Sequence, residues 1–477
     1  MIENNVKFSS NELIAIFGAD NCHFVNDFET RSVSIDSRTI TPNSIFVAIK
    51  GENFDAHNNV LESFEKGAGL CIVSKYWFEQ NKSSLEGNNT IAIENTMNAL
   101  GKLANFHRMR FDPDIIAIAG SNGKTTTKEL ISLVLETEYK ILKTYKNFNN
   151  QIGVPMMLFQ LDGTQEKVVL EIGTNEFGEI ILLSEMSNPT HGIITNIGKE
   201  HLEGFLDLDG VEVEETSLFA FLKKNEAMSF VNMDDERLRN YTMILDNKFT
   251  FGMSEDLRYD LNAKVLFDDD FTSHITFFDR TFSFDVTLQA KGLNFVYNSL
   301  AAAAIAVKFG ISNENIKKAL ESYLPDTSSD YARMSIEAKN GITLLNDTYN
   351  ANPDSTILAL DTLSKITNQS KKFAILGDMR EQGVNSVSEH VEILKQAALK
   401  ADEICLFGDD YAKAFDIAKI SGIRHFESKE MLFDFLKDEI RNLQKEKLQG
   451  NIAILVKGSR GLKMEEVSAM IRSEFLA

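Results

Sequence analysis

Cysteine, proline and positive charge are all scarce in this chain of 477 residues. The three cysteines, Cys22, Cys71 and Cys405, are odd in number and far apart, and no CxxC pair occurs. They indicate free thiols in a reducing compartment and argue against a disulfide framework or a cysteine zinc site. No apolar run approaches the ~18–20 residues that would span a bilayer, and the N-terminus lacks the pattern of a signal peptide. We therefore expect a cytoplasmic protein with no membrane insertion.

Positive charge is the scarcity with the clearest consequence for ligands. Lys and Arg total 49 against 70 for Asp and Glu, so the formal net charge is −21. Such a chain will not bind nucleic acid or an anionic membrane through its general field. An anionic ligand would have to be held by a few local cations and backbone amides.

The order of apolar runs predicts an α/β protein of three domains. A length of 477 residues suggests about three domains, and we place them at residues 1–108, 109–324 and 325–477. The first is a small α/β domain, the second a parallel-sheet ATPase domain and the third a Rossmann-like domain. The expected strands are Ile45–Ile49, Leu70–Val73, Thr90–Ile93, Ile115–Ala119, Val168–Glu171, Gly192–Thr195, Gly341–Asn346, Phe373–Leu376, Glu403–Phe407 and Asn451–Val456.

The strongest local motif is the loop Gly120-Ser121-Asn122-Gly123-Lys124-Thr125-Thr126. It follows a fully apolar strand and precedes a helical pattern, which is the setting of a nucleotide phosphate loop. Its glycines allow backbone N–H groups to surround a phosphate, and the helix N-terminus adds positive charge. Lys124 would reach the β- and γ-phosphates, and the Thr125 hydroxyl would bind Mg²⁺. The spacing is shorter than GxxxxGK[ST], because Ile118 stands where that pattern needs glycine.

Two further strand ends carry residues that can bind a metal ion. Glu171 ends one apolar run, and His201 follows another by a few residues. Taken alone, each is more simply a salt-bridged carboxylate or a hydrogen-bonded histidine. Because ligands of parallel sheets bind at the carboxyl ends of the strands, both are candidate Mg²⁺ ligands beside the phosphate loop.

Short motifs in all three blocks resemble the Mur ligase family. The first block contributes Asp36-Ser37-Arg38, Phe46-Val47-Ala48 and Gly51. The second contributes the phosphate loop, Asn147-Phe148-Asn149-Asn150-Gln151-Ile152-Gly153-Val154-Pro155, Glu171-Ile172-Gly173 and His201-Leu202-Glu203-Gly204-Phe205. The third contributes Tyr349-Asn350-Ala351-Asn352-Pro353, Leu376-Gly377-Asp378-Met379 and Val456-Lys457-Gly458-Ser459-Arg460-Gly461. Within the family, Asn350-Ala351-Asn352-Pro353 indicates the member that adds D-alanyl-D-alanine, because the diaminopimelate-adding relative would show Asp-Asn-Pro-Arg there.

The resemblance implies an ATP-dependent ligase of peptidoglycan synthesis that acts as a monomer. ATP would phosphorylate the free carboxylate of UDP-N-acetylmuramoyl-tripeptide, whose third residue is diaminopimelate or lysine. The amine of D-alanyl-D-alanine would attack the acyl phosphate and give the UDP-muramoyl-pentapeptide. Catalysis would rest on positioning and on offsetting negative charge.

The resemblance also assigns roles to individual residues. The catalytic group comprises Lys124, Glu171, His201 and Glu215. Thr125 would hold a first Mg²⁺, and Glu171 and His201 would hold a second. The expected ATP contacts are Gly120, Ser121, Asn122, Gly123, Lys124, Thr125, Thr126, Asn298, Arg333 and Asn350. The expected substrate contacts are Ser37, Arg38, Asn149, Asn150, Asn352, Lys457, Ser459 and Arg460. Without the resemblance, Ser37 and Arg38 read as a surface turn, and Asn298 as part of a packing helix.

Glu215 is a departure from the family pattern. The family usually carries a lysine, modified to a carbamate, about fourteen residues after the histidine, and this chain has Glu215 at that place. We expect the carboxylate to substitute for the carbamate at the metal; the alternative is an acidic first turn of a helix beginning near Gly210.

Two other functions stay open from the sequence. One is a related amide ligase, of the diaminopimelate-adding or folylpolyglutamate type. The other is a non-catalytic homologue that binds nucleotide, for which the Glu215 departure is the only support. Asn350–Pro353 favours the D-alanyl-D-alanine ligase over the first alternative.

Overall fold

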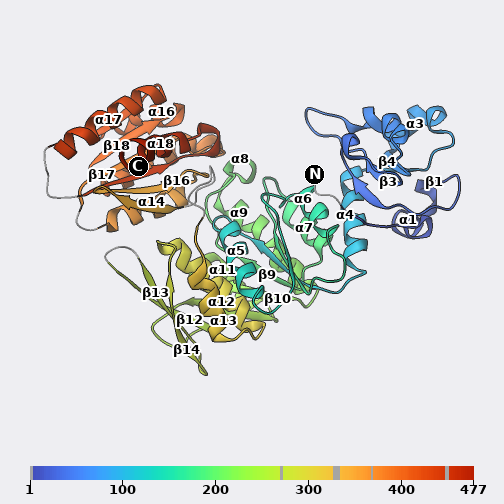
Figure 1. Cartoon of the computed structure of the whole chain (residues 1–477), viewed down its shortest axis with the longest axis horizontal. Coiled ribbons are helices and arrows are strands. Elements are labelled where there is room, and N and C mark those ends of the chain that lie inside the picture. The colour runs from blue at the N-terminus through green and yellow to red at the C-terminus, as the bar shows by residue number, and fades with distance from the viewer. Residues whose placement is uncertain (1–3, 269–271, 326–333, 367–368, 446–450, 477) are drawn as a thin grey trace.

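Three sheets follow one another along the chain (Figure 1). The computed structural model describes residues 4–268, 272–325, 334–366, 369–445 and 451–476. Helices cover all three sheets, so the predicted α/β class is confirmed.

The N-terminal sheet has five strands in the order β1-β5-β4-β3-β2, parallel except for β1. Its strands are β1 Cys22–His23, β2 Ser32–Ser34, β3 Ser44–Val47, β4 Leu70–Ser74 and β5 Thr90–Ile93. Its helices are α1 Ser10–Phe17, α2 Val60–Glu65, α3 Lys75–Asn81 and α4 Thr96–Arg108. The long helix α4 also packs on helices of the central sheet, so it joins the two parts (Figure 1).

The central sheet has nine strands in the order β14-β13-β12-β11-β10-β9-β6-β8-β7. Its strands are β6 Asp114–Ala119, β7 Ile141–Lys143, β8 Lys167–Glu171, β9 His191–Ile194, β10 Met228–Asn232, β11 Lys248–Met253, β12 Leu261–Phe267, β13 Ser273–Phe278 and β14 Ser283–Leu288. Its helices are α5 Lys124–Leu135, α6 Gly153–Leu158, α7 Glu179–Ser187, α8 Leu202–Phe205, α9 Leu208–Glu215, α10 Ser217–Lys224, α11 Glu236–Asn240, α12 Leu293–Lys308 and α13 Asn313–Ser322. The strands from β7 to β12 run parallel, and β13 and β14 form an antiparallel extension.

The C-terminal sheet has six strands in the order β15-β16-β20-β17-β18-β19, parallel except for β15. Its strands are β15 Ser335–Lys339, β16 Ile342–Asp347, β17 Gln369–Gly377, β18 Glu403–Phe407, β19 Ile423–Phe426 and β20 Asn451–Lys457. Its helices are α14 Pro353–Lys365, α15 Ser386–Ala398, α16 Asp409–Ala418, α17 Lys429–Lys445 and α18 Glu465–Ile471.

Strand β6 shows why the predicted runs are apolar throughout. Ile116 and Ile118 pack on α5 and α12 on one face of the sheet. Ile115, Ala117 and Ala119 belong to the core on the opposite face, with α4, α6 and α7. A strand covered on both faces must be apolar at every position. The predicted strands match the structure within two residues at each edge, except that β17 begins four residues earlier, at Gln369 rather than at the predicted Phe373.

No helix in the described part of the chain is both long and apolar enough to cross a membrane. All three cysteines are free thiols, as predicted; Cys71 and Cys405 are buried and Cys22 is half-buried.

Candidate functional site

Two glycines of the phosphate loop are required by its geometry. Gly120 has φ +112°, and a Cβ there would lie 2.3 Å from Thr195 Oγ1. Gly123 has φ +82°, and a Cβ there would lie 2.6 Å from Asn298 Oδ1. Only glycine fits such positions without strain. The tight loop leads directly into α5, so the N-terminal N–H groups of this helix face the same space.

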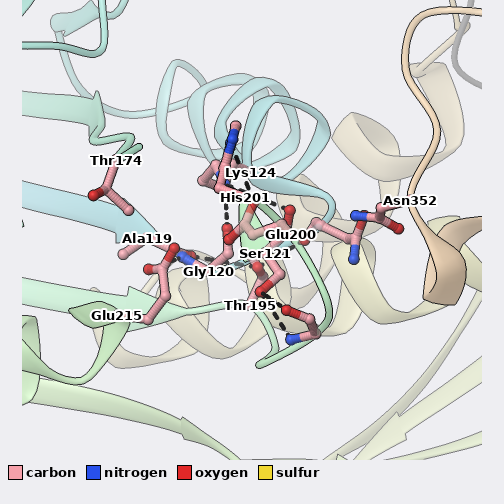
Figure 2. A network of polar contacts seen from close by, with 12 residues as sticks. Ala119, Gly120, Ser121, Lys124, Thr174, Thr195, Glu200, His201, Glu215 and Asn352 are labelled. Carbon is pink, nitrogen blue, oxygen red and sulfur yellow. Dashed lines mark hydrogen bonds and ion pairs between the residues drawn. The ribbon is translucent and has the colours of Figure 1, made fainter. Parts of the chain in front are cut away.

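Lys124 lies among carboxylates at the start of α5 (Figure 2). Its Nζ donates a hydrogen bond to the Gly120 carbonyl and lies 3.3 Å from Glu200 Oε2. Burial acts to lower the pKa of Lys124, but Glu200, Glu215 and Glu171 outweigh it, so the pKa is raised. The side chain is therefore a permanent cation at neutral pH.

Glu171 ends β8 beside this loop, as the strand-end argument predicts. One carboxylate oxygen accepts a hydrogen bond from Thr125 Oγ1 at 2.8 Å, and the other accepts one from Asn149 Nδ2 at 3.0 Å. The side chain is buried. Three predicted site residues from separate segments are thus brought together.

Glu215 is also buried, and its side chain lies near Gly120 of the phosphate loop (Figure 2). Its Oε2 accepts a hydrogen bond from the Gly120 N–H at 2.6 Å. Among the described residues, none donates a hydrogen bond to Oε1 of Glu215 or to Oε1 of the buried Glu200. Burial raises the pKa of Glu215 well above its usual range; Lys124 opposes this effect and Glu200 adds to it.

This charge balance suits a hard divalent cation. Glu171, Glu200 and Glu215 place three buried carboxyl groups around the half-buried Lys124, so this one lysine cannot balance all three in their ionised forms. Carboxylate and hydroxyl oxygens are the ligands that Mg²⁺ prefers. No three His, Cys, Asp or Glu side chains in the described ranges already converge as a complete ligand set. The residues fit Mg²⁺, while the predicted set of Thr125, Glu171 and His201 stays a prediction.

His201 immediately precedes α8 and has a left-handed backbone with φ +45°. Its Nε2 lies 4.0 Å from Glu200 Oε2, and its Nδ1 lies 2.7 Å from Glu381 Oε2. Glu381 belongs to the loop after β17, so this contact joins the central and C-terminal parts. The hydrogen bond with His201 holds the pKa of Glu381 below its usual range, despite partial burial.

A cavity of about 510 Å³ lies between the central and C-terminal sheets, and its described lining includes Glu200 and Glu381 but neither Gly120 nor Glu215. The predicted site residues that line it are Ser121, Asn122, Gly123, Lys124, Thr125, Thr126, Asn149, Glu171, His201, Asn298, Asn350, Asn352 and Lys457. A volume of several hundred Å³ is typical of a small-molecule site.

Asn352 joins the two walls of the cavity. It caps α14 with its side chain accepting from Ser355 N–H, and its Nδ2 donates to Asn122 Oδ1 at 3.0 Å. The neighbouring Asn350 is exposed in the cavity. The Tyr349–Pro353 motif therefore lies against the phosphate loop, although more than 200 residues separate the two in sequence.

The C-terminal strand-end residues are more enclosed than a surface loop would be. Lys457 is buried and bonds Asp347 at 2.5 Å and the Asn350 carbonyl at 3.0 Å, so its charge is already paired. Ser459 is buried and accepts from the Arg380 N–H. Arg460 forms an ion pair with Glu465 at 3.0 Å.

Other predicted residues are not among the described residues that line the cavity. Ser37 and Arg38 are in the N-terminal part, where Arg38 pairs with Asp36. Asn150 accepts from the N–H groups of Ile152 and Gly153 and so shapes its own turn. Arg333 lies outside the described residues.

The structure adds three residues that the motifs do not predict: Glu200, Asp347 and Glu381. Asp347 ends β16 as Glu171 ends β8, so the same strand-end rule would have found it with the strand extended by one residue. Glu200 precedes His201 directly. Nothing in the sequence indicates that Glu381 meets His201 across 180 residues.

Family models match most of this architecture. The model for the Mur ligase middle domain matches residues 118–306, and that for the Mur ligase, glutamate ligase domain, matches residues 332–460. The chain belongs to the Mur ligase family. The phosphate loop, Glu171 and His201 fall in the first match, and the Tyr349–Pro353 motif falls in the second.

Relatives within this Mur ligase family are similar along nearly their whole length. The UDP-N-acetylmuramoyl-tripeptide–D-alanyl-D-alanine ligase of Haemophilus influenzae is 32% identical over 92% of this chain and 93% of its own. The enzyme of that name from Bacillus subtilis is 31% identical over 91% and 92%. A crystal structure of MurF from Acinetobacter baumannii superposes with a TM-score of 0.84, at 27% identity over 98% of this chain and 100% of that one.

Proposed function

We propose that this Mur ligase joins D-alanyl-D-alanine to UDP-N-acetylmuramoyl-tripeptide with ATP, for peptidoglycan synthesis. The names and the coverage of the relatives support this substrate pair. The single observation that carries it is the cavity in which the phosphate loop meets the Tyr349–Pro353 motif. It brings nucleotide chemistry and the motif of the D-alanyl-D-alanine-adding member to one place.

Two steps follow from the chemistry of the substrates. A carboxylate oxygen of the tripeptide attacks the γ-phosphorus of ATP, which forms an acyl phosphate and releases ADP. The dipeptide amine then attacks the acyl carbon, phosphate leaves, and the amine loses a proton. Both steps gather anions, and Lys124 with the loop N–H groups offsets that charge.

One Mg²⁺ would be held by Thr125 and a second by Glu171 and His201, and the bound ions would neutralise phosphate charge. Thr125 and Asn149 orient Glu171 through hydrogen bonds to its two oxygens. Glu215 fixes the loop by accepting from the Gly120 N–H, and its buried carboxyl group lies near the lysine, where nearby Mg²⁺ would favour the ionised form. Its role in place of a carbamylated lysine is part of this proposal.

The remaining contacts divide between nucleotide and acceptor. Gly120, Ser121, Asn122, Gly123, Thr126, Asn298, Arg333 and Asn350 are proposed to meet ATP. Asn149, Asn150, Asn352, Ser459 and Arg460 are proposed to meet the tripeptide end or the dipeptide. Lys457, already paired with Asp347, is proposed to support this site by holding the loop that carries Asn350. Ser37 and Arg38 are proposed to hold the UDP end, within a division of the chain at residues 1–108, 109–324 and 325–477.

Phosphate release tests the proposal. Purified protein, ATP, Mg²⁺ and UDP-N-acetylmuramoyl-tripeptide would be assayed with and without D-alanyl-D-alanine, and the product weighed by mass spectrometry. We expect release that depends on the dipeptide and matches the pentapeptide formed. Release that is equally fast without the dipeptide would contradict the proposal. A parallel assay with free diaminopimelate as the amine and UDP-N-acetylmuramoyl-dipeptide as the carboxylate substrate tests the related amide ligase.

A further inference from the structure

One loop of the C-terminal part contacts His201, which immediately precedes α8. The loop follows β17 and runs from Asp378 to Asn385. Its Glu381 carbonyl accepts a hydrogen bond from the Glu203 N–H at 3.2 Å. Gly383 lies so close to α8 that a Cβ there would be 3.2 Å from Glu203 Cα. Backbone contacts therefore seat this loop on the helix that His201 begins.

The side chain of the same glutamate contacts the imidazole. Glu381 Oε2 lies 2.7 Å from His201 Nδ1. A carboxylate can only accept a hydrogen bond, so Nδ1 carries the proton in this contact. The partner of one ring nitrogen decides what the other nitrogen presents. Nε2 is then the nitrogen that faces Glu200, and it lies 4.0 Å from Glu200 Oε2.

Both partners have uncommon backbone conformations. His201 has φ +45° and Glu381 has φ +63°. Non-glycine residues rarely adopt the left-handed region, and they persist there only where surrounding contacts hold them. The two residues that meet across the interface are therefore each held by their surroundings in an unfavourable conformation, as is usual for functional sites.

We propose that Glu381 is a positioning residue for His201. When the Asp378–Asn385 loop is seated on α8, its carboxylate fixes the imidazole with Nε2 toward the cavity. The site on the central sheet is thus complete only while the C-terminal sheet is docked. This inference rests on the proposed function, since it concerns the same reaction.

A simple adhesive role for the contact is the competing explanation, and the structure offers a matched control for it. Lys199 Nζ and Glu389 Oε1 form an ion pair of 2.7 Å between the same two parts. Glu389 is on α15, and neither partner contacts the imidazole in the described structure. If the loop only holds the parts together, losing Glu389 should do as much harm as losing Glu381.

Three variants separate the explanations: Glu381→Ala, Glu381→Gln and Glu389→Ala. Steady-state ligation would give kcat, KM for ATP and the Mg²⁺ concentration for half-maximal rate. We expect Glu381→Ala to lower kcat about 10- to 100-fold, the range known for partners that orient a metal-binding histidine. Glutamine keeps an acceptor oxygen, so Glu381→Gln should recover most of that loss. Glu389→Ala should stay within about twofold of the parent, because it removes only one interface ion pair.

A second readout needs no turnover. Ring-nitrogen NMR of ¹⁵N-histidine-labelled protein at one fixed pH, with His201 assigned through His201→Gln, reports which nitrogen carries the proton. We expect Nδ1–H in the parent and in Glu389→Ala, and a shift toward Nε2–H in Glu381→Ala. Unchanged His201 signals in Glu381→Ala, or an equal loss of kcat in Glu389→Ala, would overturn the proposal. If the parent itself does not ligate, the proposed function fails, and the ring-nitrogen signals alone decide whether Glu381 sets the imidazole.

Discussion

Two lysines occupy similar places in two different sheets, yet their surroundings differ. Lys124 follows β6 of the central sheet, and Lys457 ends β20 of the C-terminal sheet. Lys457 is paired one to one with Asp347 and also holds the Asn350 carbonyl. Lys124 has several carboxylates around it and a side chain that is 15% exposed, against 2% for Lys457. One lysine is a structural tie within a closed pair, and the other belongs to an unbalanced cluster open to the cavity.

This contrast explains how an acidic protein handles an anionic nucleotide. A neutral, closed ion pair such as Lys457–Asp347 offers nothing to a phosphate, but it fixes the loop that carries Asn350. An excess of carboxylates beside Lys124 attracts a divalent cation, and the cation with the lysine can then meet a polyanion. We therefore expect changes at Lys457 to act on stability and changes at Lys124 to act on turnover.

The largest effect is expected at the closed pair. Lys457→Met leaves the Asp347 carboxylate buried without its partner, which typically costs about 3–5 kcal/mol. Urea unfolding of the variant should therefore show a much lower midpoint. Adding Asp347→Asn should recover part of the loss, because the uncompensated charge is removed.

The control for this pair is Lys413→Met. Lys413 also pairs with an aspartate, at 2.8 Å, but its side chain is 60% exposed. Exposed pairs contribute about 0–1 kcal/mol, so the midpoint should barely move. Equal midpoints for Lys457→Met and the parent would show that Lys457 is not a structural tie.

The second effect concerns the open cluster. Lys124→Ala should lower kcat by about 10²–10³-fold, the usual cost of losing a group that stabilises transition-state charge. Binding of the UDP-substrate, measured by calorimetry, should remain, because Ser37 and Arg38 lie outside the cavity lining. Turnover close to that of the parent would mean that this loop does not meet the reacting phosphate.

The third effect separates two adjacent glutamates of α9. Glu215→Gln removes the ionisable carboxyl group near Lys124, and we expect a loss of about tenfold or more in turnover with a higher Mg²⁺ requirement. Added bicarbonate should change nothing, since a carboxylate needs no CO₂. Glu214→Gln is the matched control: Glu214 is also buried, but it accepts from the N–H groups of Gly178 and Ile180 at the start of α7.

Glu214→Gln should keep near-normal turnover, whatever it does to stability. If Glu215→Gln behaves in the same way, Glu215 does not substitute for a carbamate, and its hydrogen bond to Gly120 is only a support for the loop.

The sequence predicts best those regions whose interactions are formed by residues close together in the chain. The phosphate loop is predictable because its glycines, lysine and following helix are contiguous. Glu171 is predictable because the carboxyl ends of parallel strands share one edge. The antiparallel extension is not: β13 alternates buried and half-buried residues over Ser273–Phe278, so it shows no continuous apolar run.

Contacts between segments that are distant in the chain are the second kind of feature that the sequence does not predict. Lys457 looks like a free cation in sequence, because Asp347 is 110 residues away. The contact of His201 with Glu381 and that of Asn122 with Asn352 depend on how two sheets pack together. A single sequence contains no periodic or local signal for such contacts.

The smallest effect tests which cation meets the dipeptide, now that Lys457 is known to be paired. Arg460 follows β20, and its fork of N–H groups suits a carboxylate. Its side chain is 42% exposed and shares its charge with Glu465. We expect Arg460→Ala to raise KM for D-alanyl-D-alanine about three- to fivefold, which is ~1 kcal/mol for a partly exposed pair. KM for ATP should change less than twofold, because Arg460 is absent from the described cavity lining. Steady-state titrations of both substrates with the parent and with Arg460→Lys give the comparison. Equal changes in both KM values would mean that Arg460 only supports the loop.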